Sequence, residues 1–283
     1  MFTNADLQKA AWSSTWADRP NAKASGRGAL IHVTDVGVNG GSFWRSTGST
    51  WVPAGPIVLA QSNLPMLVPA LVTGSAGTYA KSGTTITVTS AGHTIPATTY
   101  NGGSVYLSLS GGTETSGWFT NFSRTGTGTF TCTSTTSGTD SGTAATNIAE
   151  TTVTPLTTTI PGGVMGANGK LAFHVIGSNG DTANDKTLKV KFGTAVVAQR
   201  VTTNGSGAET NFEEEHWIAN RGNVAKQVNY AGTLVGGAGI GATALTYSTV
   251  DTAADVSLTA TITVATADEF MALESFSAVL YPA

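Results

Sequence analysis

Charged residues are scarce in this sequence. Only 11% of its 283 residues are Asp, Glu, Lys or Arg, whereas about 25% is usual in globular domains. The formal net charge is -3, and the 14 basic residues are scattered. Nucleic-acid binding needs clustered Lys and Arg to displace counterions from phosphates, so the composition argues against it. A surface with so few charges is weakly hydrated, which predicts an oligomer; a neutral monomer covered with Thr and Ser is the alternative.

Cysteine and long apolar runs are scarce as well. Cys132 is the single cysteine, so no intrachain disulfide can form, and it is expected to be a small packing residue. The first residues lack the basic and apolar regions of a signal peptide. No apolar stretch approaches the roughly 20 residues that a membrane helix requires. We therefore expect synthesis and folding in a cytoplasm, without membrane insertion.

Glycine and threonine are abundant instead. The chain has 35 glycines, which supply the positive-φ positions of tight turns, while Thr suits a half-buried pleated surface. Together they predict an all-β protein with many short strands and few helices. The length suggests about two domains, and the strand pattern divides the chain into three units.

The first unit, residues 1–72, is predicted to contain a helix, two β-hairpins and a linker. The helix is expected from Asn4 to Trp12, with an Asn cap. Asn39-Gly40 and Thr47-Gly48 mark the two hairpin turns. Residues 55–72 are rich in proline, which blocks helices and central strands, so we expect an extended linker whose apolar side chains pack on a neighbour.

The second unit, residues 73–149, shows four alternating segments joined by Gly-rich turns between Thr84 and Thr133. This spacing is typical of a small β-sandwich or barrel. The segment 134–146 has low complexity and is expected to be a loop or linker.

The third unit, residues 150–283, contains about eight candidate strands, which suit a jelly-roll-like antiparallel sandwich. The segment 186–192 places Leu188, Val190 and Phe192 on one face and lysines on the other. One face of this sheet is therefore expected to be buried and the other wet.

Four histidines were considered as metal ligands. They lack the fixed spacing of a metal site, and a structural role is expected of each: His32, His93, His174 and His216. The run Glu213-Glu214-Glu215 could form a general acid or a cation site. On a strand, however, only Glu213 and Glu215 share a side, and a solvated strand edge or a salt link to a neighbouring subunit is favoured.

Two loops resemble ligand sites only weakly. Asn179, Asp181, Asn184 and Asp185 offer oxygen ligands for calcium, but an Asx-rich turn is favoured because the EF-hand spacing is missing. The run Gly236–Gly241 lacks the Lys-Ser/Thr of a phosphate-binding loop, which favours a flexible loop. No catalytic, cofactor-binding or metal-binding residue is predicted, and the protein is expected not to be an enzyme.

Several segments resemble modules of phage virion proteins. Thr85–Ser90 with His93, Gly102–Leu107 and Phe130–Thr133 look like a small β module of phage fibre and tail proteins. Residues 28–55 are similar to small β elements that often precede a phage fibre body.

The C-terminal unit resembles a second phage module. Met165–Leu171, Asn184–Gly193, Asn220–Gly222 and the closing segment 256–281 are similar to a domain of phage fibres and head appendages. The resemblance implies a trimeric jelly roll.

Together these resemblances imply a structural component of a bacteriophage particle. We expect a homotrimeric fibre or appendage subunit on the tail that contacts the host surface. A capsid decoration or head-fibre protein is the alternative, and an enzyme acting on polysaccharide is a remote one. The expected partners are other virion proteins (tail, portal-proximal or capsid) and a host surface glycan. The expected location is the virion, assembled in the host cytoplasm.

Aromatic residues are the candidate binding groups. Trp118 and Phe119 follow a Gly-rich turn and Tyr247 lies in a loop-like stretch. Aromatic faces stack on sugar rings, so these three are candidates for receptor binding, with core packing as the alternative. Four tryptophans of the first unit are the candidates for anchoring the chain to the particle: Trp12, Trp16, Trp44 and Trp51.

Overall fold

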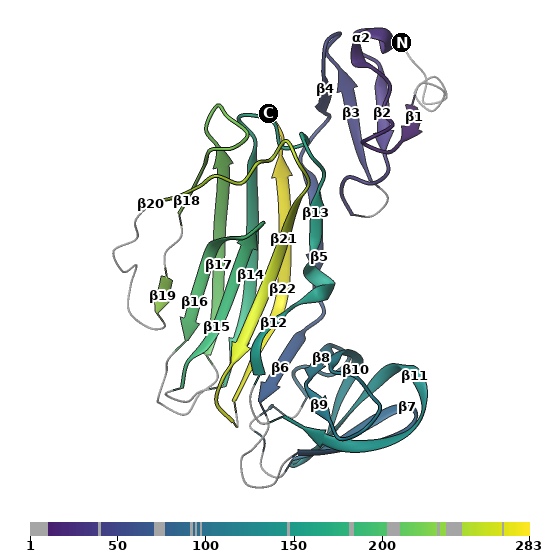
Figure 1. Cartoon of the computed structure of the whole chain (residues 1–283), viewed down its shortest axis with the longest axis vertical. Helices are drawn as coiled ribbons and strands as arrows, with labels where there is room; N and C mark the ends of the chain where they lie inside the picture. Colours follow the sequence, from purple (N-terminus) through teal and green to yellow (C-terminus); the bar gives the residue numbers. More distant parts are fainter. Residues whose placement is uncertain are drawn as a thin grey trace.

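The fold is all-β, as expected, and is built from three units. In this computed structural model an N-terminal sheet lies at one end, a sandwich in the middle and a small β unit at the other end (Figure 1). No helix in the part of the chain described is long and apolar enough to cross a membrane. The structure describes residues 11–38, 41–70, 77–90, 93, 95–96, 98–145, 148–180, 184–202, 210–230, 233–235, 245–267 and 269–283.

The N-terminal sheet contains the two expected hairpin pairings. Strands β2 and β3 pair antiparallel, β3 and β4 do the same, and β1 lies parallel to β2. The turn residues Asn39 and Gly40 lie outside the described residues. So does most of the helix expected up to Trp12, but that prediction is wrong at its end because Trp12 lies in β1. The elements are β1 (Ala11–Ser14), α2 (Ala22–Ser25), β2 (Leu30–Val33), β3 (Ser42–Ser46) and β4 (Trp51–Pro53).

The proline-rich segment forms strands rather than a linker. Strands β5 (Ile57–Ser62) and β6 (Met66–Ala70) both pair antiparallel with β22 (Glu269–Tyr281), which is long enough to hold them one after the other. Strand β6 also pairs with β8 (Ser104–Leu107), but only at Met66 and Leu67. Pro69 lies beyond that contact, where a missing N–H interrupts no ladder with β8.

The small unit is a twisted set of strands around an aromatic core. The segment expected to be a loop, 134–146, is mostly strand: residues of β11 from Gly138 to Ala144 pair with β7, after an irregularity that follows Thr133. The core includes Phe119, Phe122 and Phe130. With β8, the strands are β7 (Gly77–Thr89), β9 (Leu109–Ser110), β10 (Gly117–Gly126) and β11 (Thr129–Ala144).

The C-terminal unit is a sandwich of two sheets. Leu188, Val190 and Phe192 of β15 are buried in its core, as the alternation predicted. One sheet includes β14 (Lys170–Asn179), β17 (Thr210–Asn220), β18 (Gln227–Tyr230), β20 (Leu245–Ser248), β22 and β5. The other contains β12 (Ile148–Thr152), β13 (Thr158–Ile160), β15 (Lys186–Phe192), β16 (Ala195–Thr202), β19 (Thr233–Val235) and β21 (Val256–Val264), with a 3₁₀ turn at Thr154–Leu156.

Strand β22 joins the sandwich to the small unit. It pairs with β14 and β6, and β6 continues the sheet into β8, β10, β11 and β7. Across this junction the ring of Tyr100 packs against Phe270 at 5.6 Å, and its hydroxyl is hydrogen-bonded to Ser178 at 2.7 Å. The two units therefore share one continuous sheet.

Candidate functional site

Two of the four candidate anchoring tryptophans are buried in the N-terminal unit. The rings of Trp16 and Trp44 lie 4.5 Å apart. Alternation along β3 turns Trp44 inward, where its indole N–H donates to Ser42 at 2.9 Å. The indole N–H of Trp16 donates to the Gly162 carbonyl of the sandwich at 2.8 Å. Both side chains therefore pack inside the N-terminal unit, and Trp16 also joins this unit to the sandwich.

Trp51 occupies a different position. Its side chain is half-buried, and its indole N–H donates to the Pro20 carbonyl at 2.6 Å. The side chain of Trp12 lies outside the residues whose side chains are described. The side chain of Trp51 is therefore more accessible than those of Trp16 and Trp44.

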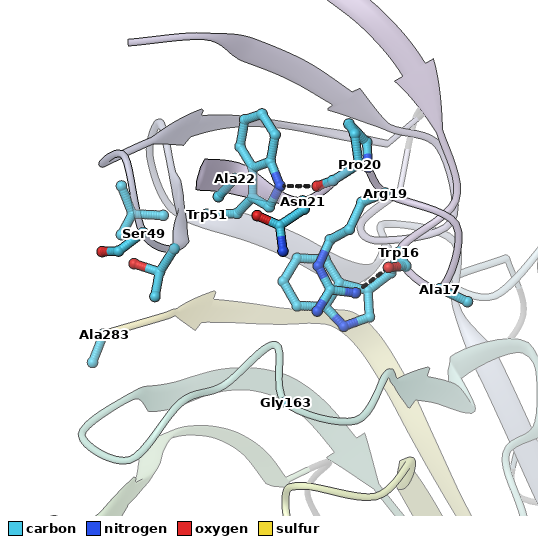
Figure 2. Close-up of a pocket in the computed structure, with 12 residues that line it drawn as sticks. Trp16, Ala17, Arg19, Pro20, Asn21, Ala22, Ser49, Trp51, Gly163 and Ala283 are labelled. Carbon is cyan, nitrogen blue, oxygen red and sulfur yellow. Dashed lines mark hydrogen bonds between the residues drawn. The ribbon is translucent and has the colours of Figure 1, made fainter. Parts of the chain in front are cut away.

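Trp51 and Trp16 line a cleft between the N-terminal unit and the sandwich (Figure 2). Its volume is about 600 Å³. Two wall positions come from the sandwich: Gly163 and the C-terminal residue Ala283. The remaining wall residues come from the N-terminal unit: Trp16, Ala17, Arg19, Pro20, Asn21, Ala22, Ser49, Thr50, Trp51 and Val52.

Arg19 carries the only ionisable side chain among these wall residues. Its guanidinium lies 3.7 Å from the centre of the Trp16 ring and donates to the Trp16 carbonyl. Burial lowers the pKa of Arg19, against a smaller opposing effect of Asp35. A cation, an indole and several hydroxyl groups can bind a ligand by stacking and hydrogen bonding. This wall contains no pair of side chains for general acid–base chemistry.

The three candidate receptor-binding residues do not form one site. Phe119 is only 5% exposed and belongs to the core of the small unit, which agrees with the alternative of core packing. Trp118 is half-buried beside Tyr106, and its indole N–H donates to the Thr152 carbonyl at 2.9 Å. Tyr247 is 64% exposed on β20, a strand of the sandwich far from β10 in the order of the sheet.

Phe43 is an exposed aromatic residue that the sequence reasoning did not single out. It is 54% exposed on β3, and His32 stacks beside it at 4.8 Å. The alternation of β3 could have found it, because an inward Trp44 requires its neighbour to point outward.

The histidines and the glutamate run have local partners. His174 is hydrogen-bonded to Glu213 at 2.8 Å, and His216 to Glu214 at 3.2 Å. Glu214 is buried and paired with Arg200. Burial acts to raise the pKa of Glu214, but hydrogen bonds to His216 and Arg200 together outweigh it, so the pKa is lowered. Glu214 is thus not part of a solvated edge. The opposite faces expected for Glu214 and its two neighbours are confirmed.

The remaining candidate residues were singled out as possible metal or phosphate ligands or as a nucleophile. Among the described residues, no three His, Cys, Asp or Glu side chains are grouped to hold a metal ion. Asp181 and Gly236–Gly241 lie outside those residues, while Asn184 donates to Glu269 at 3.2 Å. Cys132 is buried, and burial raises its pKa to about 12, in keeping with the expected packing role.

Comparison with protein-family models, with curated proteins and with solved structures found no match to this chain.

Proposed function

We propose that this protein is a non-enzymatic structural subunit of a bacteriophage particle. In this proposal it forms a homotrimeric fibre or appendage on the tail, bound to other virion proteins and in contact with a glycan of the host surface. The proposal rests first on the resemblance of its segments to phage fibre modules.

The arrangement of the units is the structural observation that supports the proposal best. The N-terminal sheet and the small β unit lie at opposite ends of a central sandwich (Figure 1). Such an order gives one end for attachment and leaves the rest of the chain to project outward. Several weak contacts on one particle then act together through avidity.

Attachment is assigned to the N-terminal sheet. Because Trp16 and Trp44 are buried, the exposed ring of Phe43 and the cleft beside Trp51 are the surfaces available to a partner. Contact with a host glycan is assigned to Trp118 of the small unit, whose half-buried ring lies beside Tyr106.

The location is tested by labelling phage particles with gold-conjugated antibodies against this chain. Label on the tail supports the proposal, and label spread over the capsid would favour the decoration or head-fibre alternative. Particles without label would contradict a virion role. Light scattering should give the purified protein a mass near three times 28.7 kDa.

The attachment surface is tested with Phe43→Ser. This exposed substitution should leave the mass and the fold unchanged but reduce incorporation into particles. Leu64→Ser is the control, because it removes another large exposed apolar side chain that lies outside the N-terminal sheet. Normal incorporation of Phe43→Ser would exclude this contact.

A further inference from the structure

The two outer faces of the sandwich differ in chemistry. The face formed by β15, β21 and β12 is polar: Lys189 and Lys191 both pair with Glu150, and Thr261 and Thr259 lie opposite them on β21. The Lys189 ammonium is 2.9 Å from the Glu150 carboxylate. The charges of the two lysines and Glu150 are paired with one another, and this polar face is compatible with contact with water.

The opposite face, formed by β20, β18, β17, β14 and β22, carries a row of apolar and aromatic side chains. The strand register places Tyr247, Val228, Ala219, Lys170 and Tyr281 side by side across the five strands. Tyr247 is 64% and Tyr281 45% exposed.

A second row lies beside the first. Trp217, Ala172, Val279 and Val58 are neighbours across β17, β14, β22 and β5. Trp217 is 38% exposed although its strand is central in the sandwich. Large exposed apolar patches of this kind mark interaction surfaces. We call the two rows, together with Arg221 at one end and Glu213 and Glu215 at the other, the aromatic face.

The small unit covers only one end of this sheet, where Tyr100 packs on Phe270. The aromatic face begins beyond that contact, at Glu213. Ile176, which is paired with Glu213, is 37% exposed. None of the described residues covers it in the single chain.

Exposed charges of opposite sign lie at the two ends of the aromatic face. Lys170 and Arg221 lie at one end, over the rings of Trp217 and Tyr247. Glu213 and Glu215 are exposed at the other end. Glu213 is paired in register with Ile176, six residues along β14 from Lys170, a separation of about 20 Å. The ring of His174 is hydrogen-bonded to Glu213 at 2.8 Å.

We propose that the aromatic face is the surface through which copies of this chain associate, with the Glu213 and Glu215 end of one copy against the Lys170 and Arg221 end of the next. The occupant is a second copy because the face is complementary to itself in charge, whereas stacking on a neutral sugar requires no such separation of charge. This proposal rests on the oligomer included in the proposed function. Opposite ends that attract one another can close either a two-fold pair or a three-fold ring.

Charge reversal tests the proposal on the full-length chain. The acidic end is reversed in Glu213→Lys/Glu215→Lys and the basic end in Lys170→Glu/Arg221→Glu. Each double variant should associate at least about ten-fold more weakly by light scattering over a concentration series, because like charges then meet at the contact. A variant with all four substitutions restores the complementarity and should recover the wild-type mass. Near-UV circular dichroism verifies that each variant is folded.

A matched control and a mixing experiment sharpen the result. Lys23→Glu/Arg45→Glu makes the same charge change on exposed residues of the N-terminal unit and should keep the wild-type mass. An equimolar mixture of the two double variants should form an even-numbered assembly if the contact is two-fold. In a three-fold ring the mixture cannot satisfy all three contacts, while the fourfold variant can.

The outcomes separate this inference from the proposed function. Unchanged association in both double variants would exclude the aromatic face while leaving an oligomer formed elsewhere. A folded fourfold variant that stays dissociated would show that charge pairing does not hold the contact. A wild type that is monomeric at every concentration, with polysaccharide binding lost in Trp217→Ala, would make the face a glycan surface. None of these results depends on whether antibodies label phage particles.

Discussion

The interior of this protein contains charged side chains in ion pairs. The ammonium of Lys186 lies 2.8 Å from the carboxylate of Glu269, and both side chains are buried. The guanidinium of Arg200 pairs with Glu214 in the sandwich core. Taking two charges out of water is costly, so such pairs depend on both members being present.

Removal of one member of the Lys186–Glu269 pair should therefore be more harmful than removal of both. Lys186→Met leaves the Glu269 carboxylate buried without its cation and should lower the free energy of unfolding by about 3–5 kcal/mol. The double variant Lys186→Met/Glu269→Leu should lose much less. Urea unfolding followed by tryptophan fluorescence measures both, and equal losses would contradict the pairing.

His93 gives the small unit a pH dependence. Its side chain is buried, and neither ring nitrogen has a hydrogen-bond partner among the described residues. Burial, and then the charge of Arg124, lower the pKa of His93 from its usual 6.5. The unfolded chain then takes up a proton before the folded chain does, so stability should be complete above about pH 6.5 and decline below it, by at most about 1.4 kcal/mol per pH unit.

The substitution His93→Leu tests this dependence because it removes the titrating group. The thermal midpoint of the wild type should fall between pH 7 and pH 5, and the variant should lose much of that slope. Asp140 and Glu150 also have pKa values lowered from their usual 3.8 and 4.5. Their contributions to stability are lost only at a more acidic pH than that of His93. An identical slope in both proteins would assign the effect to another group.

At the scale of elements, the long pair of β7 and β11 holds a loop through one carboxylate. Asp140 accepts the hydroxyl of Tyr79 at 2.7 Å and the amides of Thr113 and Glu114. Burial and the bond to Asp140 raise the pKa of Tyr79 to about 12. Gly112 is required here, since a Cβ would lie 2.1 Å from the Tyr79 hydroxyl.

Asp140→Ala should release this loop without unfolding the strands. The amides of Thr113 and Glu114 lose their acceptor, so their hydrogen exchange should become faster by at least about ten-fold. Amides in the β7–β11 ladder should keep their protection. Thr139→Ala, an exposed change on the same strand, is the control. Unchanged exchange in Asp140→Ala would mean that other contacts hold the loop.

Elements with a regular apolar alternation could be predicted from the sequence, and others could not. Segment 186–192 buries Leu188, Val190 and Phe192 because alternation determines the sides of a strand. The residues from Gly138 to Ala144 lack that pattern, and they form a strand because β7 offers a continuous partner. The prolines of segment 55–72 predict a linker, whereas pairing of β5 and β6 with β22 determines their conformation.

The candidate sites show the same division. Alternation along the strand correctly separated Glu214 from Glu213 and Glu215. The cation that pairs with Glu214 is Arg200, which lies in the other sheet of the sandwich. Burial of Trp16 depends on Gly162, which is distant in the sequence. Side-chain exposure at these residues therefore could not be inferred from local pattern.

At the scale of the whole molecule, the boundary of the N-terminal unit matters most for experiments. Strands β5 and β6 are part of the central sheet, although residues 1–72 were expected to be one segment. Deletion of residues 1–54 removes the N-terminal sheet and leaves these two strands in place.

We expect the chain without residues 1–54 to be soluble and folded but unable to join the particle. Deletion of residues 1–72 should instead cause aggregation, because it removes strands from β22 and exposes an unpaired edge. Solubility, circular dichroism and particle incorporation measure the difference. A soluble, folded product of the longer deletion would show that β5 and β6 are dispensable.

The sequence by itself determined the all-β class, the hairpins of the N-terminal unit and the inward faces of strands such as β15. These depend on local properties: glycine at turns, β-branched residues in strands and alternation along them. Only the tertiary structure decided that β22 links two units, that Trp16, Trp44 and Phe119 are buried, and that exposed aromatic side chains gather on one face of the sandwich. The reason is that strand pairing and burial depend on partners far away in the sequence, which local patterns do not identify.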